Sequence, residues 1–181
     1  MALTMRRLRL KAVWLIVLPF FWFSSPTLEF LAVGAALAVL GLWIRGWSAG
    51  TIHKDEELTV SGPYAFTRNP LYVGSFLIGV GVSLAGGHWI WPALFLLFYG
   101  AVYTRTMARE SEELARLFGD RYPEYRTNVP GFFPRLSPFR ASGPVASGGF
   151  RWSQYKRNRE WEASLGALAT FALLAAKTMW L

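Results

Sequence analysis

Long apolar segments are the feature that most restricts how this chain can fold. Of its 181 residues, 53% are hydrophobic and 17% are aromatic, a composition that favours a membrane protein over a soluble domain. A helix needs about 20 apolar residues to cross the hydrocarbon core, so the first segment is long enough only if the basic side chains before it snorkel. We therefore expect an all-α, polytopic membrane protein with about five transmembrane helices. The five apolar segments occupy residues 12–23, 28–47, 71–84, 89–103 and 163–181.

The positive charges gather at one end of these segments. Four cations precede the first segment, three lie between Arg45 and Arg68, and eleven lie between Arg105 and Arg159, whereas the turns at 24–27 and 86–88 have none. The positive-inside rule assigns such basic loops to the cytoplasm. We expect a bacterial inner-membrane protein whose N-terminus and active site are cytoplasmic and whose C-terminus is on the opposite side. The net charge of +8 then indicates contact with anionic membrane lipids, and no nucleic-acid partner is expected.

Several classes of site are excluded by what the sequence lacks. It contains no cysteine, which excludes disulfides, thiolate metal ligands and cysteine nucleophiles. It has two histidines, too few for a histidine-rich metal centre, so no metal is expected. His53 lies beside Lys54 and Asp55 and is predicted to be a surface histidine, whereas His88, in a turn at the other end, is predicted to lie at the membrane interface.

Residues 62–74 bring turn formers, two tyrosines, a cation and an amide together directly before an apolar segment. Gly62-Pro63 and Asn69-Pro70 are turn signals, and Pro70 suits the first position of a helix. A charged helix at residues 105–118 continues the fourth apolar segment, so its first turns should lie beside these polar residues. Its acidic side chains either form surface ion pairs on a solvated helix or help to hold an ammonium group, and their spacing alone favours neither.

The order of the motifs resembles the isoprenylcysteine carboxyl methyltransferase family, which is related to the phospholipid methyltransferases. The resemblance covers residues 50–135 and implies an integral membrane enzyme that uses S-adenosyl-L-methionine, with a helical fold in place of a Rossmann sheet. No strand–glycine-rich loop–helix unit occurs in the sequence, in agreement with that fold. The motifs are Gly62-Pro63-Tyr64, Arg68-Asn69-Pro70-Leu71-Tyr72-Val73-Gly74, Glu112-Glu113, residues 118–125 and Val129-Pro130.

The resemblance also implies a domain organisation and a set of site residues. Residues 1–181 would form one membrane methyltransferase domain, with a catalytic core at 62–135 and a C-terminal amphipathic segment plus last span at 151–181. The implied catalytic residues are Arg68, Asn69, Tyr72 and Glu113. The implied cofactor-binding residues are these four together with Tyr64, Pro70, Leu71, Gly79, Gly81, Arg109, Glu112, Tyr122 and Tyr125.

Some of these assignments have a structural alternative. Gly79 and Gly81 resemble the small-x-small element of the phospholipid enzymes, but helix packing explains them equally well. Tyr122 and Tyr125 either stack on adenine or anchor a short helix after Gly119. The sequence departs from the family pattern in two places: Asn69 stands where many members have histidine, and Gly131 stands where many have arginine. Arg135 lies close enough in sequence to substitute for that arginine.

Methyl transfer from S-adenosylmethionine requires chiefly that donor and acceptor be aligned and water excluded. A carboxylate acceptor needs no base, whereas an amine or thiol must lose a proton, for which the candidates are Glu113, Tyr64, Tyr72 and His53. The sequence thus predicts methyl transfer to a lipid-like or membrane-associated acceptor: a prenylcysteine-type carboxylate, an aminophospholipid or a small thiol. Two alternatives stay open, a membrane reductase-like relative that uses NADPH and a catalytically silent membrane scaffold of the same fold.

Overall fold

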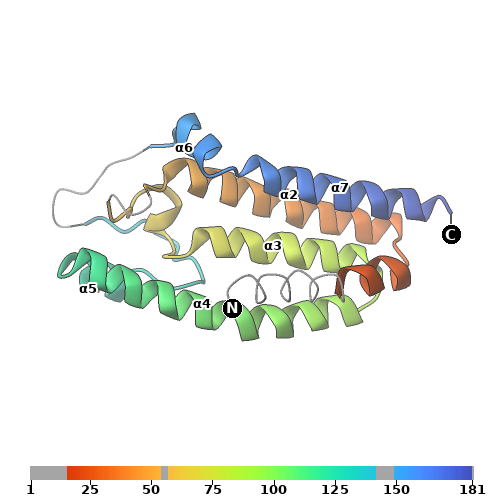
Figure 1. The fold of residues 1–181 in the computed structure, drawn as a ribbon, viewed down its shortest axis with the longest axis horizontal. Helices are drawn as coiled ribbons and strands as arrows, with labels where there is room; N and C mark the ends of the chain where they lie inside the picture. The colour runs from red at the N-terminus through yellow and green to blue at the C-terminus, as the bar shows by residue number, and fades with distance from the viewer. Residues whose placement is uncertain (1–15, 54–56, 142–148, 181) are drawn as a thin grey trace, which may run out of the picture.

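The computed structural model describes residues 16–53, 57–141 and 149–180, and within these ranges it contains helices and no strand (Figure 1). The all-α fold predicted from the sequence is therefore confirmed. The basic arm before residue 12, the first part of the first apolar segment and Lys54 lie outside the described residues. Residues 16–23 are helical, and the further elements are α2 (Leu28–Thr51), the 3-10 helix η1 (Gly62–Ala65), α3 (Pro70–Ala85), α4 (Ile90–Phe118), α5 (Arg121–Asn128), α6 (Trp152–Arg157) and α7 (Trp161–Thr178).

The helix boundaries follow from local side-chain chemistry. Thr27 is the N-cap of α2, where its side chain accepts a hydrogen bond from the backbone N–H of Phe30. Pro70 is the first residue of α3, a position at which its missing N–H costs no hydrogen bond. Gly119 ends α4 with a φ of +50°, a conformation that is strained for residues with a Cβ. As predicted, α4 is one continuous helix that carries the fourth apolar segment into the charged region.

The number of membrane spans expected from the sequence is not confirmed. Among the described residues, α2, with 24 residues, is the helix that is long and apolar enough to cross a membrane, and α3 is apolar but has 16 residues. Figure 1 shows α2, α3, α4 and α7 running side by side along the long axis of the molecule.

Two pairs of glycines bring α2 and α3 into backbone contact. A Cβ built on Gly34 would lie within 3.0 Å of the carbonyl oxygen of Gly81, and one on Gly41 would lie as close to that of Gly74. The reverse contacts are equally short, so both members of each pair must lack a side chain. Because the glycines are seven residues apart on each helix, the two antiparallel helices touch at two successive levels.

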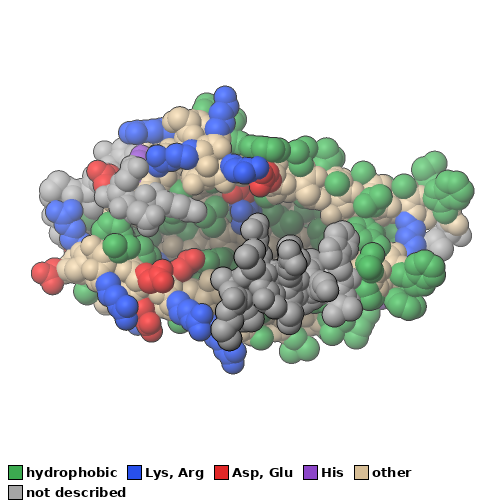
Figure 2. Space-filling view, viewed as in Figure 1, with side chains coloured by type: hydrophobic (Ala, Val, Ile, Leu, Met, Phe, Trp, Pro, Cys, Tyr) green, Lys and Arg blue, Asp and Glu red, His purple; other side chains and the backbone are tan. Residues whose placement is uncertain are grey.

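The two ends of the bundle differ in chemistry. At one end, the backbone N–H of Ser25 donates to the carbonyl of Gly86 at 2.9 Å, which joins the two turns that carry no Lys or Arg. The C-terminal end of α7 lies there too, where Lys177 Nζ donates to the carbonyls of Phe21 (2.7 Å) and Trp22 (2.9 Å). On the face shown in Figure 2, charged side chains gather over the α4–α5 and α6 end, and hydrophobic side chains dominate the end where α7 finishes.

Two irregular or short segments complete the charged end. Residues 129–141 run along η1, where the N–H of Arg68 donates to Pro130 O and the N–H of Phe139 donates to Ala65 O, both at 2.9 Å. The region of α6 docks on the last turns of α2, where Asn158 Nδ2 donates to Ala49 O at 2.8 Å. Glycines leave room for aromatic rings at this junction, so that Phe150 packs on Gly50. This docking places the start of α7, at Trp161, close to the last turns of α2 at the charged end.

Candidate functional site

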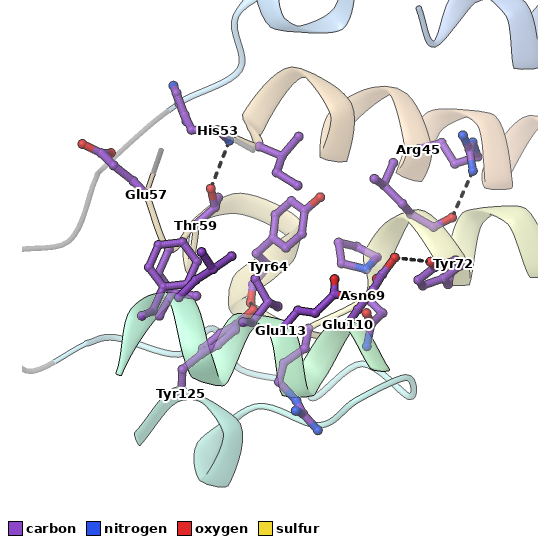
Figure 3. A pocket seen from close by; sticks show the side chains of 18 residues that line it. Arg45, His53, Glu57, Thr59, Tyr64, Asn69, Tyr72, Glu110, Glu113 and Tyr125 are labelled. Carbon is purple, nitrogen blue, oxygen red and sulfur yellow. Dashed lines mark hydrogen bonds between the residues drawn. The ribbon is translucent and has the colours of Figure 1, made fainter. Parts of the chain in front are cut away.

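A pocket of about 440 Å³ lies at the charged end, where α2 ends and α3 begins (Figure 3). Its walls come from the last turns of α2, the connector with η1, the first turn of α3 and the charged part of α4. Segments that are far apart in the sequence, around Asn69 and Glu113, therefore converge on one cavity. The lining residues are Arg45, Ile52, His53, Glu57, Leu58, Thr59, Tyr64, Arg68, Asn69, Pro70, Leu71, Tyr72, Glu110, Glu113, Leu114, Leu117, Phe118 and Tyr125.

The α4 wall of the pocket carries two carboxylates. Glu110 and Glu113 are three residues apart on the helix, so they share a face, and Figure 3 shows both rising from α4 toward Asn69 and Tyr72. The hydroxyl of Tyr72 donates a 2.5 Å hydrogen bond to Oε1 of Glu110. Tyr72 is itself held by Tyr99, whose hydroxyl donates to the Tyr72 carbonyl at 2.7 Å. The α4 wall thus presents negative charge to the pocket, and the carboxylate of Glu110 is held in position by Tyr72.

The Arg68 guanidinium is held by one residue of α4 and one residue of α5. Its Nη1 donates to Ser111 Oγ at 3.3 Å and to the hydroxyl of Tyr122 at 3.1 Å, and Tyr122 is almost fully buried. Its Nε is buried and has no hydrogen-bond partner in the described residues. A buried donor without a partner costs free energy, and such groups in native structures call for an explanation, a bound ligand being one.

Tyr64 supplies a second polar atom of this kind. Its side chain is 6% exposed and its hydroxyl has no hydrogen-bond partner in the described residues, although the residue lines the pocket. Figure 3 shows the hydroxyl directed toward the α2 side of the pocket and away from α4. Burial raises the pKa of the Tyr64 phenol well above its usual value, so the group stays protonated near neutral pH. It is therefore suited to donate a hydrogen bond to a ligand and not to act as a base.

Tyr125 has a structural bond in addition to its place on the pocket wall. Its hydroxyl donates to the carbonyl of Tyr64 at 2.7 Å, which ties α5 to η1. Burial raises the pKa of the Tyr125 phenol as well. Of the two tyrosines predicted after Gly119, Tyr125 lines the pocket, and Tyr122 lies behind Arg68 without lining it.

The structure brings together most of the predicted site residues and leaves five aside. Eight line the pocket: Tyr64, Arg68, Asn69, Pro70, Leu71, Tyr72, Glu113 and Tyr125. Gly81 faces Gly34 of α2, and Gly79 faces the ring of Phe95, so both are helix-packing positions. Arg109 and Glu112 are exposed on α4 outside the pocket lining, and Tyr122 supports Arg68.

The prediction that His53 is a surface histidine is wrong. His53 is 8% exposed and lines the pocket, and its backbone N–H donates to Thr59 Oγ1 at 3.2 Å. The polarity of its sequence neighbours gave no sign of this burial.

Three further charged residues line the pocket that were not among the predicted site residues: Arg45, Glu57 and Glu110. The helix period could have revealed Glu110, since residues 110, 113, 114 and 117 share one face whereas the adjacent Glu112 and Glu113 point about 100° apart. Arg45 was counted with the connector, but it lies inside α2. A cation in an otherwise apolar helix is itself a functional signal.

The fold and site together define a bundle of apolar helices with a charged pocket at one end. Residues 28–121, just over half of the chain, match the family model described as phospholipid methyltransferase. The chain belongs to this family, and the resemblance predicted from the motifs at residues 50–135 is confirmed. The matched region contains α2, η1, α3 and α4, and with them all the pocket-lining residues except Tyr125.

Curated relatives include enzymes and metal-resistance proteins. The nickel-cobalt-cadmium resistance protein NccN of Alcaligenes xylosoxydans xylosoxydans is 33% identical over 121 residues, which are 66% of this chain and 55% of that protein. The protein-S-isoprenylcysteine O-methyltransferase of Schizosaccharomyces pombe is 31% identical over 119 residues, 63% of this chain and 50% of that protein. The cobalt-zinc-cadmium resistance protein CzcN of Cupriavidus metallidurans is 33% identical over 120 residues, 66% of this chain and 54% of that protein. The chain spans about half the length of these relatives, and no solved structure matches it.

Proposed function

We propose that this chain transfers a methyl group from S-adenosylmethionine to a lipid-like or membrane-associated acceptor in the pocket beside Asn69 and Glu113. The observation that carries the proposal is the convergence of the two motifs on one cavity. Two of its lining residues, Tyr64 and Arg68, each carry a buried polar atom that has no hydrogen-bond partner within the described residues. Membership of the phospholipid methyltransferase family supports methyl transfer as the reaction class.

The residues present fit S-adenosylmethionine in size and charge. A cavity of about 440 Å³ lies in the range of small-molecule sites. Glu110 and Glu113 are suited to the donor's positive sulfonium and ammonium groups, and the Arg68 guanidinium is suited to its carboxylate. The Tyr64 hydroxyl, on the α2 side of the pocket, is suited to a different polar group of the donor. When bound, the donor supplies an activated methyl group, so the chain has chiefly to hold it, orient the acceptor and exclude water.

The acceptor is proposed to be a prenylcysteine-type carboxylate or an aminophospholipid. The name of the Schizosaccharomyces pombe relative favours the former, and the description of the family favours the latter. A carboxylate acceptor would react without a base. An amine would first give its proton to one of the carboxylates on α4, and Glu110 joins Glu113 as a candidate for that role. The protonated phenol of Tyr64 is not suited to it.

We place the charged end of the bundle, with the pocket, on the cytoplasmic side of a bacterial inner membrane. The support is the distribution of cations, because the described turns at 24–27 and 86–88 are free of Lys and Arg. In this arrangement the apolar segments cross the bilayer as about five spans, and the C-terminus lies on the opposite side. A lipid-like acceptor would then reach the pocket from the bilayer.

Equilibrium binding to the detergent-purified protein tests the donor, and transfer from isotopically labelled S-adenosylmethionine to extracted native lipids tests the reaction. We expect saturable binding and a labelled lipid detected by mass spectrometry. Absence of binding at millimolar S-adenosylmethionine would exclude the proposal, and binding of NADPH in its place would favour a reductase-like relative. Binding without transfer to any lipid or metabolite would point to a catalytically silent scaffold.

A further inference from the structure

Arg45 reaches the pocket from inside α2 and is held by a carboxylate from the far end of the sequence. Its Nε and Nη2 both bind the carboxylate of Glu160, the latter at 3.0 Å, and Glu160 is 6% exposed. Glu160 directly precedes α7 and lies outside residues 28–121, the region that matches the family. The C-terminal part of the chain therefore contributes a buried charge directly behind the pocket wall.

The other nitrogen of the Arg45 guanidinium is bound by α3. Nη1 donates to Ser75 Oγ at 2.5 Å and to the carbonyl of Leu71 at 3.3 Å. Gly74 makes this position possible, since a Cβ there would collide with the Arg45 stem. The guanidinium is thus fixed at the junction of α2, α3 and α7, with its charge compensated by one buried carboxylate.

Compensation matters because of the other charges in the pocket. Arg68 is a second cation in the lining, which also holds the carboxylates of Glu57, Glu110 and Glu113. Neither Glu110 nor Glu113 forms an ion pair within the described residues. With Glu160 in place, Arg45 adds no net charge to this set, and the pocket keeps its negative character. Without Glu160, an uncompensated cation would stand on the wall of a cavity proposed to hold a sulfonium, and it would repel that ligand.

We propose that Glu160 is a positioning residue that cancels the charge of Arg45 and so adapts the pocket to a cationic ligand. The inference rests on the proposed function, because the cation in question is the sulfonium of the methyl donor. It assigns to the C-terminal segment, outside the matched family region, a direct part in ligand selection.

The test compares the affinities of S-adenosylmethionine and S-adenosylhomocysteine, which differ in a methyl group and in the positive charge on sulfur. In Glu160→Gln, the preference for the charged ligand over the neutral one should fall at least about tenfold, since one unit charge within about 12 Å at an effective dielectric constant of about 20 changes the affinity by that factor or more. If Glu160 had a purely structural role, its substitution would weaken the binding of both ligands equally and leave the ratio of the two affinities unchanged. The matched control is Glu162→Gln, which removes a carboxylate two residues on that is 49% exposed and paired with Arg159 at the surface, and which should not change the ratio.

A second variant adds charge without breaking the pair. In Ser75→Asp, a carboxylate replaces the hydroxyl that contacts Arg45 Nη1, so the preference for S-adenosylmethionine should rise. In Ser75→Asp/Glu160→Gln, the new carboxylate should compensate Arg45 from the other side and restore the wild-type ratio. Removal of one partner of a buried ion pair can prevent folding. If Glu160→Gln does not fold, the ratio of the two ligand affinities in Ser75→Asp alone tests the inference.

The outcomes separate this inference from the function on which it rests. If the wild-type protein binds neither ligand, the proposed function fails. If it binds both and the ratio is unchanged in Glu160→Gln, or is unchanged or falls in Ser75→Asp, the role of Glu160 is overturned while the function stands. A ratio that falls in the first variant, rises in the second and recovers in the double variant supports the inference.

Discussion

The side-chain amide of Asn69 donates a hydrogen bond of 2.7 Å to the carbonyl oxygen of Gly131. These are the two positions at which the sequence departs from the isoprenylcysteine methyltransferase pattern, and the structure places them in contact. Gly131 also lies against Arg68, since a Cβ at 131 would be 3.2 Å from Nη2. The two departures therefore form one local arrangement, in which the amide ties residues 129–141 to the start of α3 and the glycine leaves room for the guanidinium.

This contact predicts a loss of stability in Asn69→Asp. A carboxylate cannot donate to the Gly131 carbonyl, so the substitution removes a hydrogen bond and faces one acceptor with another. We expect a loss of about 1–3 kcal/mol in the free energy of unfolding, measured in detergent. The control is Asn128→Asp, because Asn128 makes a similar bond to Glu124 O at 2.8 Å but is exposed. Equal losses in the two variants would contradict a special role for the Asn69 contact.

The two neighbouring glutamates on α4 should respond differently to substitution. Both side chains are exposed, but Glu113 lines the pocket and Glu112 does not. Glu113→Ala should weaken binding of S-adenosylmethionine by about 1.5–3 kcal/mol, the range for a hydrogen bond to a charged group. Glu112→Ala should leave the affinity unchanged. Isothermal titration of both variants decides the point, and a larger effect at Glu112 would mean that α4 is rotated relative to the structure.

Tyr64→Phe should change stability and ligand affinity in opposite directions. The buried hydroxyl has no partner within the described residues, so its removal should stabilise the ligand-free protein by about 1 kcal/mol. The same change should weaken the binding of S-adenosylmethionine by about 0.5–1.5 kcal/mol if the hydroxyl binds the ligand. Thermal unfolding with and without ligand measures both effects.

Tyr125→Phe is the matched control for that prediction. It removes a hydroxyl that has a partner, the Tyr64 carbonyl, and should therefore destabilise the ligand-free protein. A loss of stability in Tyr64→Phe as large as that in Tyr125→Phe would mean that the Tyr64 hydroxyl is satisfied in the free protein.

Gly81→Ala tests the contact between α2 and α3. The added Cβ would meet the Gly34 carbonyl, and because this partner is backbone, the helices must separate. Overpacking of this kind costs about 1–3 kcal/mol, which unfolding in detergent would register. Gly100→Ala is the control, since Gly100 lies in α4 with no atom within 4 Å of its Cβ position. A tolerated Gly81→Ala would show that the packing contact is looser than the structure indicates.

Sequence patterns predicted the parts of this protein that depend on local chemistry. The start of α3 at Pro70 and the end of α4 before Gly119 follow from residues next to each boundary. The approach of Asn69 to Glu113 could be predicted because α4 is continuous and the turn before it is short.

The features that the sequence did not reveal depend on contacts between distant segments. Glu160 and Arg45 are 115 residues apart, and nothing in either neighbourhood identifies the other as a partner. His53 is buried and its backbone N–H donates to Thr59, six residues further along the chain. Glu110 shares the pocket face of α4 with Glu113, whereas the adjacent Glu112 does not. In each case the missing information was a tertiary position and not a residue preference.

The glycine contacts between α2 and α3 also bear on how an acceptor reaches the pocket. Where Gly34 meets Gly81 and Gly41 meets Gly74, backbone touches backbone, so this seam admits no acyl or prenyl chain. A hydrocarbon tail arriving from the bilayer must therefore enter between other helices. Because α2 and α3 are in backbone contact, they would stay fixed relative to each other, and any movement that opens the pocket would involve helices other than this pair.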